Sequence, residues 1–387
     1  MIDQMTIFEE LYPTYKIDKP IRLIELFAGI GSQAKALKNL GADFEHWKVI
    51  EWDKYPMASY NAIHGTNFET SDITKIHASD LEIIDRDKYC YIMTYSFPCQ
   101  DLSLAGKLGG MTKGTGTRSG LLWEVERILD ECNGNLPDVL LMENVPQVIG
   151  KNNIKDFQLW RKKLEELGYS NYVELLNAKD FGIPQNRNRC FMVSILGEWN
   201  YTFPKKKKLK IRLKDLLEKD VDEKYYLSDQ MVDFFRYNSK KQEELGNGFR
   251  FETVNDKEVA KAITTRNGSR MDDNFIETMV VREGGLFDSE NGTHQAGSVY
   301  NENGLSPSLD TMQGGYRQPM IEEKKSNLRI RKLTPCECYK LMGFSEEDYK
   351  KASQVNSDSQ LYKQAGNSIV VNVLMAIFGE MLDTLEK

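Results

Sequence analysis

Short apolar segments alternate with helical patterns from Ile21 to about Gly197, and this alternation restricts the fold more than any other feature of the chain. Each apolar segment has the length and the β-branched composition of a buried strand. The linking segments carry apolar residues at three- and four-residue spacing, which predicts crossover helices around a parallel sheet. The six predicted strands are IRLIELF, WKVIEW, YIMTYS, DVLLMENV, YVELLNA and CFMVSIL.

The character of the chain changes after residue 199, and this change indicates a second domain. A chain of 387 residues exceeds the usual size of a single hydrophobic core, so two domains are expected. Residues 200–330 are rich in Gly, Asn, Ser and Thr, with short weak strands and turn dipeptides such as Asn267-Gly268. This composition predicts a smaller, irregular and mostly β domain.

Helical patterning returns near residue 331. Thr334 and Pro335 are followed by Glu337 at the third position after the cap, which predicts a helix that starts with a capping box. The final pattern, residues 370–387, is apolar enough on one side to pack onto the first domain. We therefore expect a first domain of residues 1–199 and 357–387, and a second domain of residues 200–356 that includes the helix after Thr334.

Cysteine content limits the classes of protein to which this chain can belong. Its six cysteines show no CxxC pair, which argues against a disulfide framework and a structural zinc site, so we expect no metal. The N-terminus is acidic and broken by Pro13 and Pro20, unlike a secretory signal, and no apolar run approaches a membrane span. We expect a soluble protein of the cytoplasm.

The net charge of −7 leaves nucleic-acid binding open, because phosphates respond to the local field of a groove and not to the mean charge. Lysines cluster at residues 204–214. This cluster is either a phosphate-facing strip or a solvated linker, and its composition does not decide between them.

A glycine-rich turn joins the first predicted strand to the first predicted helix. Gly29 and Gly31 allow a tight turn where a ligand can approach the backbone and a helix N-terminus. The third glycine of the dinucleotide-binding fingerprint is missing, with Gln33 and Ala34 in that region. The turn therefore favours a nucleoside site over a pyrophosphate site.

Acidic side chains follow the next two strand patterns. Glu51 is placed to hold ribose hydroxyls, Asp72 to accept from an adenine amino group, and Trp52 to cover the base or the sugar. Each acid taken alone is equally consistent with a surface carboxylate. Together with the glycine turn, the three residues predict a cofactor that contains adenosine.

The dipeptide Pro98-Cys99 directly follows a predicted buried strand. Proline restricts its own backbone and that of its neighbour, so the cysteine is held in a defined geometry where the strand stops. A structural buried thiol is the alternative for an isolated cysteine. The position after the strand favours a nucleophile.

Three charged residues complete the pattern. Glu143 follows a wholly apolar strand, where a carboxylate is costly unless it is paired, used in chemistry, or bonded to backbone amides. Arg187 and Arg189 alternate into the last predicted strand and share one face. Their planar cations suit a phosphate or a pyrimidine carbonyl, and a surface salt bridge is the alternative.

The ordered set of motifs resembles the DNA (cytosine-5)-methyltransferase family over nearly the whole chain. FAGIGS resembles the cofactor loop of the family, SFPCQDLS its nucleophile motif, ENV its glutamate motif and QNRNR its arginine motif. Residues 331–344 and 364–374 resemble its two C-terminal motifs. The resemblance implies a Rossmann-like class I methyltransferase sheet with helices on both faces, joined to a smaller target-recognition domain.

The resemblance also implies a reaction. Cys99 adds to carbon 6 of a cytosine flipped out of double-stranded DNA, and Glu143 protonates the adjacent ring nitrogen. Carbon 5 then takes the methyl group of S-adenosylmethionine, and S-adenosylhomocysteine is the product. Arg189 contacts the cytosine carbonyl, whereas Arg187 grips a phosphate or orders the loop. The implied cofactor contacts are Phe27, Gly29, Ile30, Gly31, Glu51, Trp52, Asp72, Ile73, Pro98, Leu121, Asn367 and Ser368.

Contacts with DNA are expected from the arginine motif, the Gly-rich loop 105–120 and the turns of the second domain, although each turn is equally consistent with plain loop. The loop has the composition of a mobile segment that closes over the DNA. We expect a monomer that works with or without a separately encoded restriction endonuclease. The predicted DNA contacts are Gln100, Ser103, Arg118, Gln185, Thr264, Arg266, Gln313 and Arg317.

Three other interpretations are possible. A branch of the same family methylates transfer RNA, but its recognition region is short, and the long insert before residue 331 favours duplex DNA. A catalytically silent DNA-binding protein would have lost Cys99 or Glu143, and both are present. A nicotinamide-dependent dehydrogenase is disfavoured by the incomplete glycine fingerprint.

Overall fold

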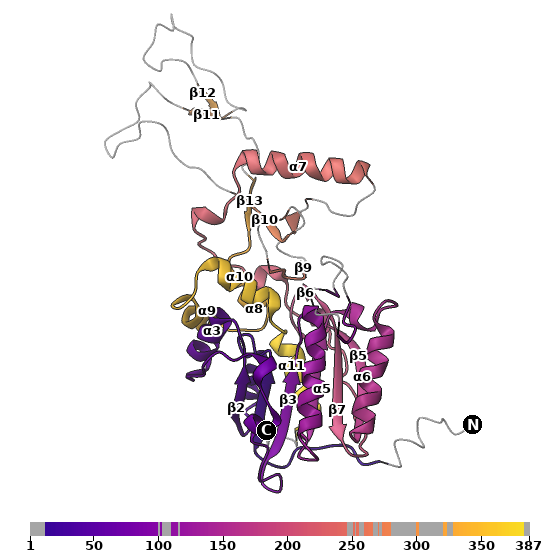
Figure 1. The fold of residues 1–387 in the computed structure, drawn as a ribbon. Helices are drawn as coiled ribbons and strands as arrows, with labels where there is room; N and C mark the ends of the chain where they lie inside the picture. The colour runs from indigo at the N-terminus through magenta and orange to yellow at the C-terminus, as the bar shows by residue number, and fades with distance from the viewer. Residues whose placement is uncertain are drawn as a thin grey trace, which may run out of the picture.

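The structure of the chain is a computed structural model with a large α/β body and a smaller part beside it (Figure 1). Among the helices of the described residues, none combines the length and the apolar character needed to cross a bilayer. The residues described are 12–99, 101–102, 110–114, 117–245, 251, 253–254, 259–265, 270, 273–279, 299–301, 320–322 and 328–382.

A six-stranded sheet forms the centre of the large body. β1 pairs in parallel with β2 and β3, and β3 pairs in parallel with β4, whereas β7 runs antiparallel to both β4 and β5. In sheet order the strands are β2 (Phe44–Ile50), β1 (Ile21–Leu26), β3 (Cys90–Tyr95), β4 (Val139–Asn144), β7 (Asn188–Leu196) and β5 (Tyr169–Asn177).

The predicted parallel direction is therefore wrong for β7. Only residues 178–187 join β5 to β7, and this segment holds a short 3-10 turn and the two-residue strand β6 (Gln185–Asn186). A parallel connection needs a crossover of about a dozen residues or more, usually a helix. The short link forces the chain to reverse, which returns the arginine motif to the carboxyl-terminal edge of the parallel strands.

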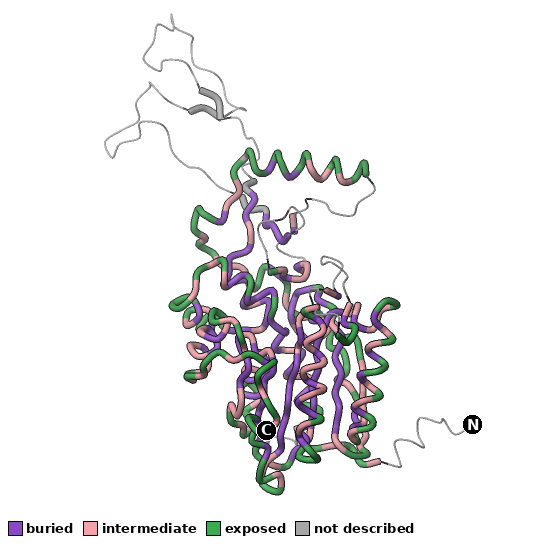
Figure 2. The backbone as a smooth tube through the Cα atoms, in the orientation of Figure 1, coloured by how far each residue is buried: buried purple, intermediate pink, exposed green. Residues whose placement is uncertain are grey.

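Helices cover both faces of the sheet, because neighbouring residues of each strand point to opposite sides. Leu140 and Met142 face a core shared with α5 (Leu122–Glu131) and α6 (Ile154–Glu166). Val139 and Leu141 face a second core shared with α2 (Ser32–Asn39) and α11 (Val371–Met381). Figure 2 shows these strands as buried, with exposed residues on the outer side of α6 and mostly intermediate ones on that of α5. The predicted α/β fold with helices on both faces is confirmed.

The helix predicted after Thr334 is present as α8 (Pro335–Leu341), and its capping box is confirmed: the Thr334 hydroxyl accepts from the Glu337 amide, and the Glu337 carboxylate accepts from the Thr334 amide at 2.8 Å. Helix α8 contacts α10 (Asp358–Asn367), and α9 (Glu346–Ser353) contacts α3 (Lys54–His64). Leu341 and Met342 belong to the core of the large body. We therefore propose that the first domain resumes near residue 333, before the predicted boundary at 357.

The second domain has a small core of its own. The sheet β13-β10-β8 packs with α7 through Val232, Phe235, Phe275 and Ile330. Helix α7 was not predicted, although Ser228 caps it by accepting from the Met231 amide at 3.3 Å. The elements here are α7 (Asp229–Glu244), β8 (Thr253–Val254), β9 (Ala260–Lys261), β10 (Phe275–Met279), β11 (Val299–Asn301), β12 (Met320–Glu322) and β13 (Leu328–Lys332).

Short elements complete the chain within the described ranges. They are α4 (Ala78–Leu81) and the 3-10 helices η1 (Ile73–Lys75), η2 (Arg118–Leu121), η3 (Pro146–Ile149), η4 (Ala178–Phe181), η5 (Leu213–Asp215) and η6 (Glu223–Tyr225).

Candidate active site

A cavity of about 560 Å³ lies at the carboxyl ends of the parallel strands. The loops after β1, β2, β3 and β4 line it together with the start of β7 and the end of α10. Strand ends that meet at one edge of an α/β sheet form the usual ligand site of this architecture. The predicted residues that line the cavity are Phe27, Gly29, Ile30, Glu51, Trp52, Asp72, Ile73, Pro98, Leu121, Asn367 and Ser368, together with Cys99, Glu143, Arg187, Arg189 and Arg118.

The loop after β1 is held from the end of β2. The Gly29 amide donates to Glu51 Oε2 at 3.0 Å, and the Asp53 amide donates to Glu51 Oε1 at 2.9 Å. Burial raises the pKa of the Glu51 carboxyl, against the effect of these amide bonds. Phe27 has a φ of 59°, a conformation that costs energy for a non-glycine residue and is concentrated at functional sites. Glu51 therefore fixes the shape of the loop in addition to facing the cavity.

Gly31 does not line the cavity but sits at the N-cap of α2 with a φ of 78°. A Cβ there would lie 2.3 Å from His64 Nε2 and 2.7 Å from Tyr60 Cε2. Gly29 has a φ of 58°, but its Cβ would meet no heavy atom within 4 Å. Both glycines therefore have a left-handed backbone, but only Gly31 lacks room for a side chain.

We expect Gly31→Ala to lower the free energy of unfolding by roughly 2–5 kcal/mol, because left-handed strain and overpacking add. Gly29→Ala is the matched control and is expected to cost roughly 1–2 kcal/mol, from strain alone. Urea unfolding of the two variants without ligand measures both values. Equal losses would show that the contact with His64 and Tyr60 has no energetic weight.

One half of the cavity, lined by Glu51, Trp52, Asp72 and Ile73, is named the nucleoside half. It has polar groups on its rim and an aromatic ring. Asp72 is exposed to solvent there, and bonds from the Thr74 amide and hydroxyl lower the pKa of its carboxyl. Trp52 is 79% exposed, a large apolar surface with nothing packed over it among the described residues. An adenosine moiety fits this combination of an exposed ring, a carboxylate and the buried Ile73.

Gln364, which the sequence patterns did not indicate, also lines the cavity. Its Oε1 accepts from the Ser59 hydroxyl at 2.8 Å and from the Tyr339 hydroxyl at 2.7 Å. Asn356 donates to the Ser59 oxygen, which leaves the Ser59 proton for Gln364 and fixes the orientation of the amide. Gln364 Nε2 is buried and bonds to no described residue.

Cys99 is half-buried after β3, on a turn held from two sides. The Ser119 hydroxyl donates to the Pro98 carbonyl at 2.6 Å, and Asn144 Nδ2 donates to the Phe97 carbonyl at 3.0 Å. Neither Ser119 nor Asn144 was predicted, although Asn144 lies within the ENV motif. Burial raises the pKa of the Cys99 thiol, and the Glu143 charge raises it further.

Glu143 faces Cys99 and the arginines from the end of β4. It pairs with Phe191 across the β4–β7 ladder, so Arg189, two residues away, lies on the same face. Arg189 Nε lies 3.2 Å from Glu143 Oε1. Burial raises the pKa of the Glu143 carboxyl, while the charges of Arg189 and Arg187 oppose the shift. No described backbone amide bonds to Glu143, so the alternative of an acid held by backbone amides has no support here.

Arg187 is buried and bonds to backbone oxygens of two segments, the second domain and the end of α10. Its guanidinium donates to the carbonyls of Ile263, Gly366 and Ser368, each at 2.9 Å. Burial lowers the pKa of Arg187 to about 9, and the charge of Arg189 adds to this effect. These contacts fit the predicted ordering of a loop. They leave the predicted grip on a phosphate without support, because Nη1 and Nη2 bind the second domain and the end of α10, and Nε is buried with no partner among the described residues.

Gln185 requires a correction. It was predicted to contact DNA, but its side chain is fully buried: Nε2 donates to the Leu341 carbonyl at 2.7 Å, and Oε1 accepts from the Ile263 amide at 3.0 Å. A side chain that satisfies both backbone partners in the interior cannot reach a base. Gln185 joins the arginine motif to α8 and to the second domain.

The remaining predicted DNA contacts are divided by what the structure describes. Arg118 is exposed at the cavity rim, and Thr264 is half-buried, with its hydroxyl donating to Asp273 at 3.1 Å. Most of the predicted closing loop also falls outside the described ranges. Predictions that lie wholly outside those ranges are Gln100, Ser103, Arg266, Gln313 and Arg317.

Comparison with known proteins decides the family. A model of the C-5 cytosine-specific DNA methylases matches residues 21–383, which include the cavity and both domains. The chain belongs to this family. The methylase is therefore a DNA (cytosine-5)-methyltransferase, as the motifs predicted.

Individual relatives agree with the family assignment. The methylase is 31% identical to the type II methyltransferase M2.ScrFI of Lactococcus lactis subsp. cremoris, over 93% of this chain and 99% of the relative. It is 32% identical to the orphan methyltransferase M.SssI of Spiroplasma monobiae, over 94% and 97%. The crystal structure of the S. pombe Dnmt2 methyltransferase has a TM-score of 0.64 at 22% identity, over 93% of this chain and 97% of that one, and supports the fold.

Proposed function

We propose that this methylase transfers a methyl group from S-adenosylmethionine to carbon 5 of a specific cytosine in double-stranded DNA, through a transient bond between Cys99 and the flipped base. The observation that carries the proposal is one continuous cavity lined both by Cys99, Glu143 and Arg189 and by the nucleoside half around Glu51 and Asp72. In this proposal a nucleophile and an acid lie next to a cofactor site.

Cys99 is the nucleophile in this proposal. Its raised pKa makes the thiol the resting form, and the charges of Arg189 and Arg187 favour the thiolate when the ring is in place. The Sγ–carbon 6 bond forms, and the electron pair of the carbon 5–carbon 6 double bond moves towards carbon 5 and the ring. Once carbon 5 is methylated, water or another base accepts the proton that carbon 5 loses, which restores the double bond and expels Cys99 as a thiolate.

Glu143 is the acid. Its raised pKa lets the carboxylate take up the proton that the Cys99 thiol gives up and pass it to ring nitrogen 3 as Cys99 adds, and the proton returns to Glu143 when Cys99 leaves. Arg189 lies beside Glu143, on the face where the carbonyl oxygen of the ring would accept from a cation. In this scheme the two residues hold the ring edge while Cys99 bonds to its face.

The cofactor site would hold S-adenosylmethionine through Glu51, Asp72, Trp52 and the backbone of the Gly29 turn, with Asn367 and Ser368 at the other end. When bound, it supplies an electrophilic methyl group. Trapped within a duplex stack, the target cytosine reaches the cavity only after flipping, at a cost of a few kcal/mol. We propose that the second domain reads the neighbouring bases.

Mechanism-based trapping tests the proposal. DNA prepared with 5-fluorocytosine in place of cytosine is incubated with the methylase and S-adenosylmethionine, and an adduct stable to denaturation is expected on the peptide that contains Cys99, because fluorine cannot leave carbon 5 as a proton does. Peptide mass spectrometry locates the bond. Methylation of ordinary DNA without any adduct on fluorinated DNA would contradict the covalent route.

The same experiment covers the RNA alternative. Transfer RNA transcripts made with 5-fluorocytidine are expected to remain free of adduct. Bisulfite sequencing of DNA from cells that express the methylase then identifies the methylated site. An adduct on RNA alone would show that the substrate is RNA, with the same chemistry at Cys99.

A further inference from the structure

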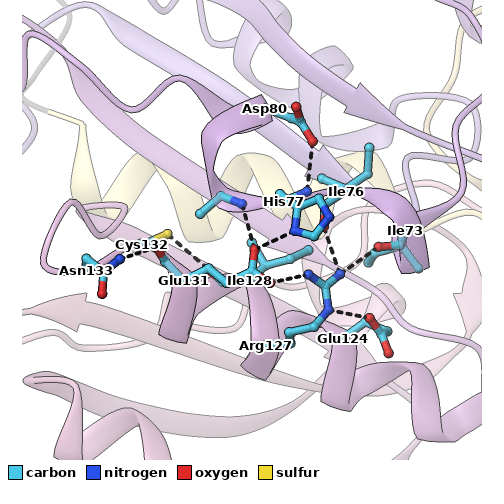
Figure 3. A network of polar contacts seen from close by, with 11 residues as sticks. Ile73, Ile76, His77, Asp80, Glu124, Arg127, Ile128, Glu131, Cys132 and Asn133 are labelled. Carbon is cyan, nitrogen blue, oxygen red and sulfur yellow. Dashed lines mark hydrogen bonds and ion pairs between the residues drawn. The ribbon is translucent and has the colours of Figure 1, made fainter.

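Arg127 on α5 reaches the turn that carries Asp72 and Ile73. Its Nη2 donates to the Ile73 carbonyl at 3.2 Å and to the Ile76 carbonyl at 2.8 Å. Figure 3 shows the guanidinium between α5 and this turn. The carbonyls belong to the beginning and the end of η1, so a single side chain holds both ends of the turn.

The other donors of Arg127 fix the position of its guanidinium. Nε donates to Glu124 at 2.8 Å, and Nη1 donates to Glu131 at 2.7 Å (Figure 3). Glu131 also accepts from the Ala78 amide and from His77 Nδ1, each at 3.1 Å. The two carboxylates therefore orient the guanidinium towards η1. Glu131 also binds the residues at the start of α4.

The turn depends on such a support. A three-residue 3-10 helix has poor hydrogen-bond geometry and little stability of its own. Its upstream side is held where the Ser71 amide donates to the Glu51 carbonyl at 2.9 Å. Its downstream side is held by Arg127. Asp72 and Ile73, between these two supports, line the nucleoside half of the cavity.

We propose that Arg127 is a positioning residue for the cofactor, which sets the backbone of Asp72 and Ile73 without touching the ligand. This inference rests on the proposed cofactor site. Loss of Arg127 weakens binding of the adenosine moiety and leaves the chemistry at Cys99 intact, because none of its hydrogen bonds to described residues reaches the part of the cavity around Cys99.

Direct binding measurements test the inference without turnover. We expect Arg127→Ala to raise the Kd of S-adenosylhomocysteine roughly tenfold or more, since two hydrogen bonds from a charged donor are lost. The Kd of adenosine alone, the second probe, is expected to rise by the same factor, because the defect lies at the nucleoside. Calorimetry of the full chain without DNA gives both constants.

Matched variants separate positioning from a general loss of structure. Arg161→Ala on α6 removes another arginine of an i,i+4 pair, with Glu165 at 3.5 Å, away from the cavity, and is expected to leave both Kd values within about twofold of wild type. Arg127→Lys keeps the charge but has all its donors on one nitrogen, which cannot bind both carbonyls and both carboxylates at once, and it is expected to give intermediate values. In turnover, KM for S-adenosylmethionine is expected to follow Kd while kcat stays within about threefold of wild type.

Each outcome decides the inference. Unchanged Kd values in Arg127→Ala, or equal changes in Arg161→Ala, would overturn the role of Arg127. A kcat loss with unchanged KM would overturn it as well. If Arg127→Ala fails to fold, the Arg127→Lys values decide in the same way. Wild-type protein that binds neither probe would refute the proposed cofactor site instead, so the two failures are distinct.

Discussion

Cys99→Ser is expected to lower kcat for methyl transfer by roughly 10⁴-fold or more, while the Kd of S-adenosylhomocysteine stays within about threefold of wild type. Serine keeps the size of the side chain, but its hydroxyl ionises far less readily than a thiol and is a much weaker nucleophile. Transfer of radioactive methyl groups to DNA measures the first quantity, and calorimetry measures the second.

Cys132→Ser is the matched control for this substitution. Cys132 is a buried cysteine at the end of α5, outside the cavity, and its thiol bonds to the Ile128 carbonyl. We expect wild-type turnover from this variant after correction for any loss of folded protein. A folded Cys99→Ser protein that no longer binds the cofactor product would show that Cys99 supports the pocket and is not the nucleophile alone.

Glu143→Gln is expected to lower kcat by roughly 10²–10⁴-fold, because an amide cannot transfer a proton to ring nitrogen 3. The same change is expected to make Cys99 more reactive towards iodoacetamide. The negative charge of Glu143 raises the pKa of Cys99, whereas Arg189 and Arg187 lower it, so removal of the carboxylate leaves the lowering charges unopposed.

The sign of this effect distinguishes catalysis from simple damage to the site. Below the wild-type pKa of Cys99, the variant has more thiolate, so its alkylation rate begins to rise at lower pH. Arg189→Ala removes a charge that lowers the pKa and is expected to move the same profile to higher pH. Identical alkylation profiles for the three proteins would refute the electrostatic coupling of Cys99 to Glu143 and Arg189.

Local patterns predicted most of the sheet and the cavity, because a buried strand and the residues at its end are neighbours in the sequence. The apolar run before Glu143 and the glycines after β1 are examples. The direction of β7 was mispredicted because it depends on the length of a link, and a strand pattern looks the same in either direction.

The roles of Arg187 and Gln185 could not be predicted from neighbouring residues in the sequence. Both side chains bond to backbone groups from residues far along the chain, such as Ile263 and Leu341. A polar residue beside a catalytic motif has the same appearance whether it faces a ligand or a distant carbonyl. Only the packing of the second domain and of α8 against the motif separates the two.

The placement of α10 and α11 has a consequence for synthesis of the protein. Asn367 and Ser368 close one end of the cavity, Arg187 reaches the carbonyl of Ser368, and the Ile17 amide donates to the Met381 carbonyl at 2.8 Å. When the sheet and Cys99 have been translated, the cavity therefore still lacks the wall that the end of α10 supplies. Because the pocket is complete only when α10 and α11 dock beside the first strand, we expect the nascent polypeptide to stay inactive until translation is nearly finished.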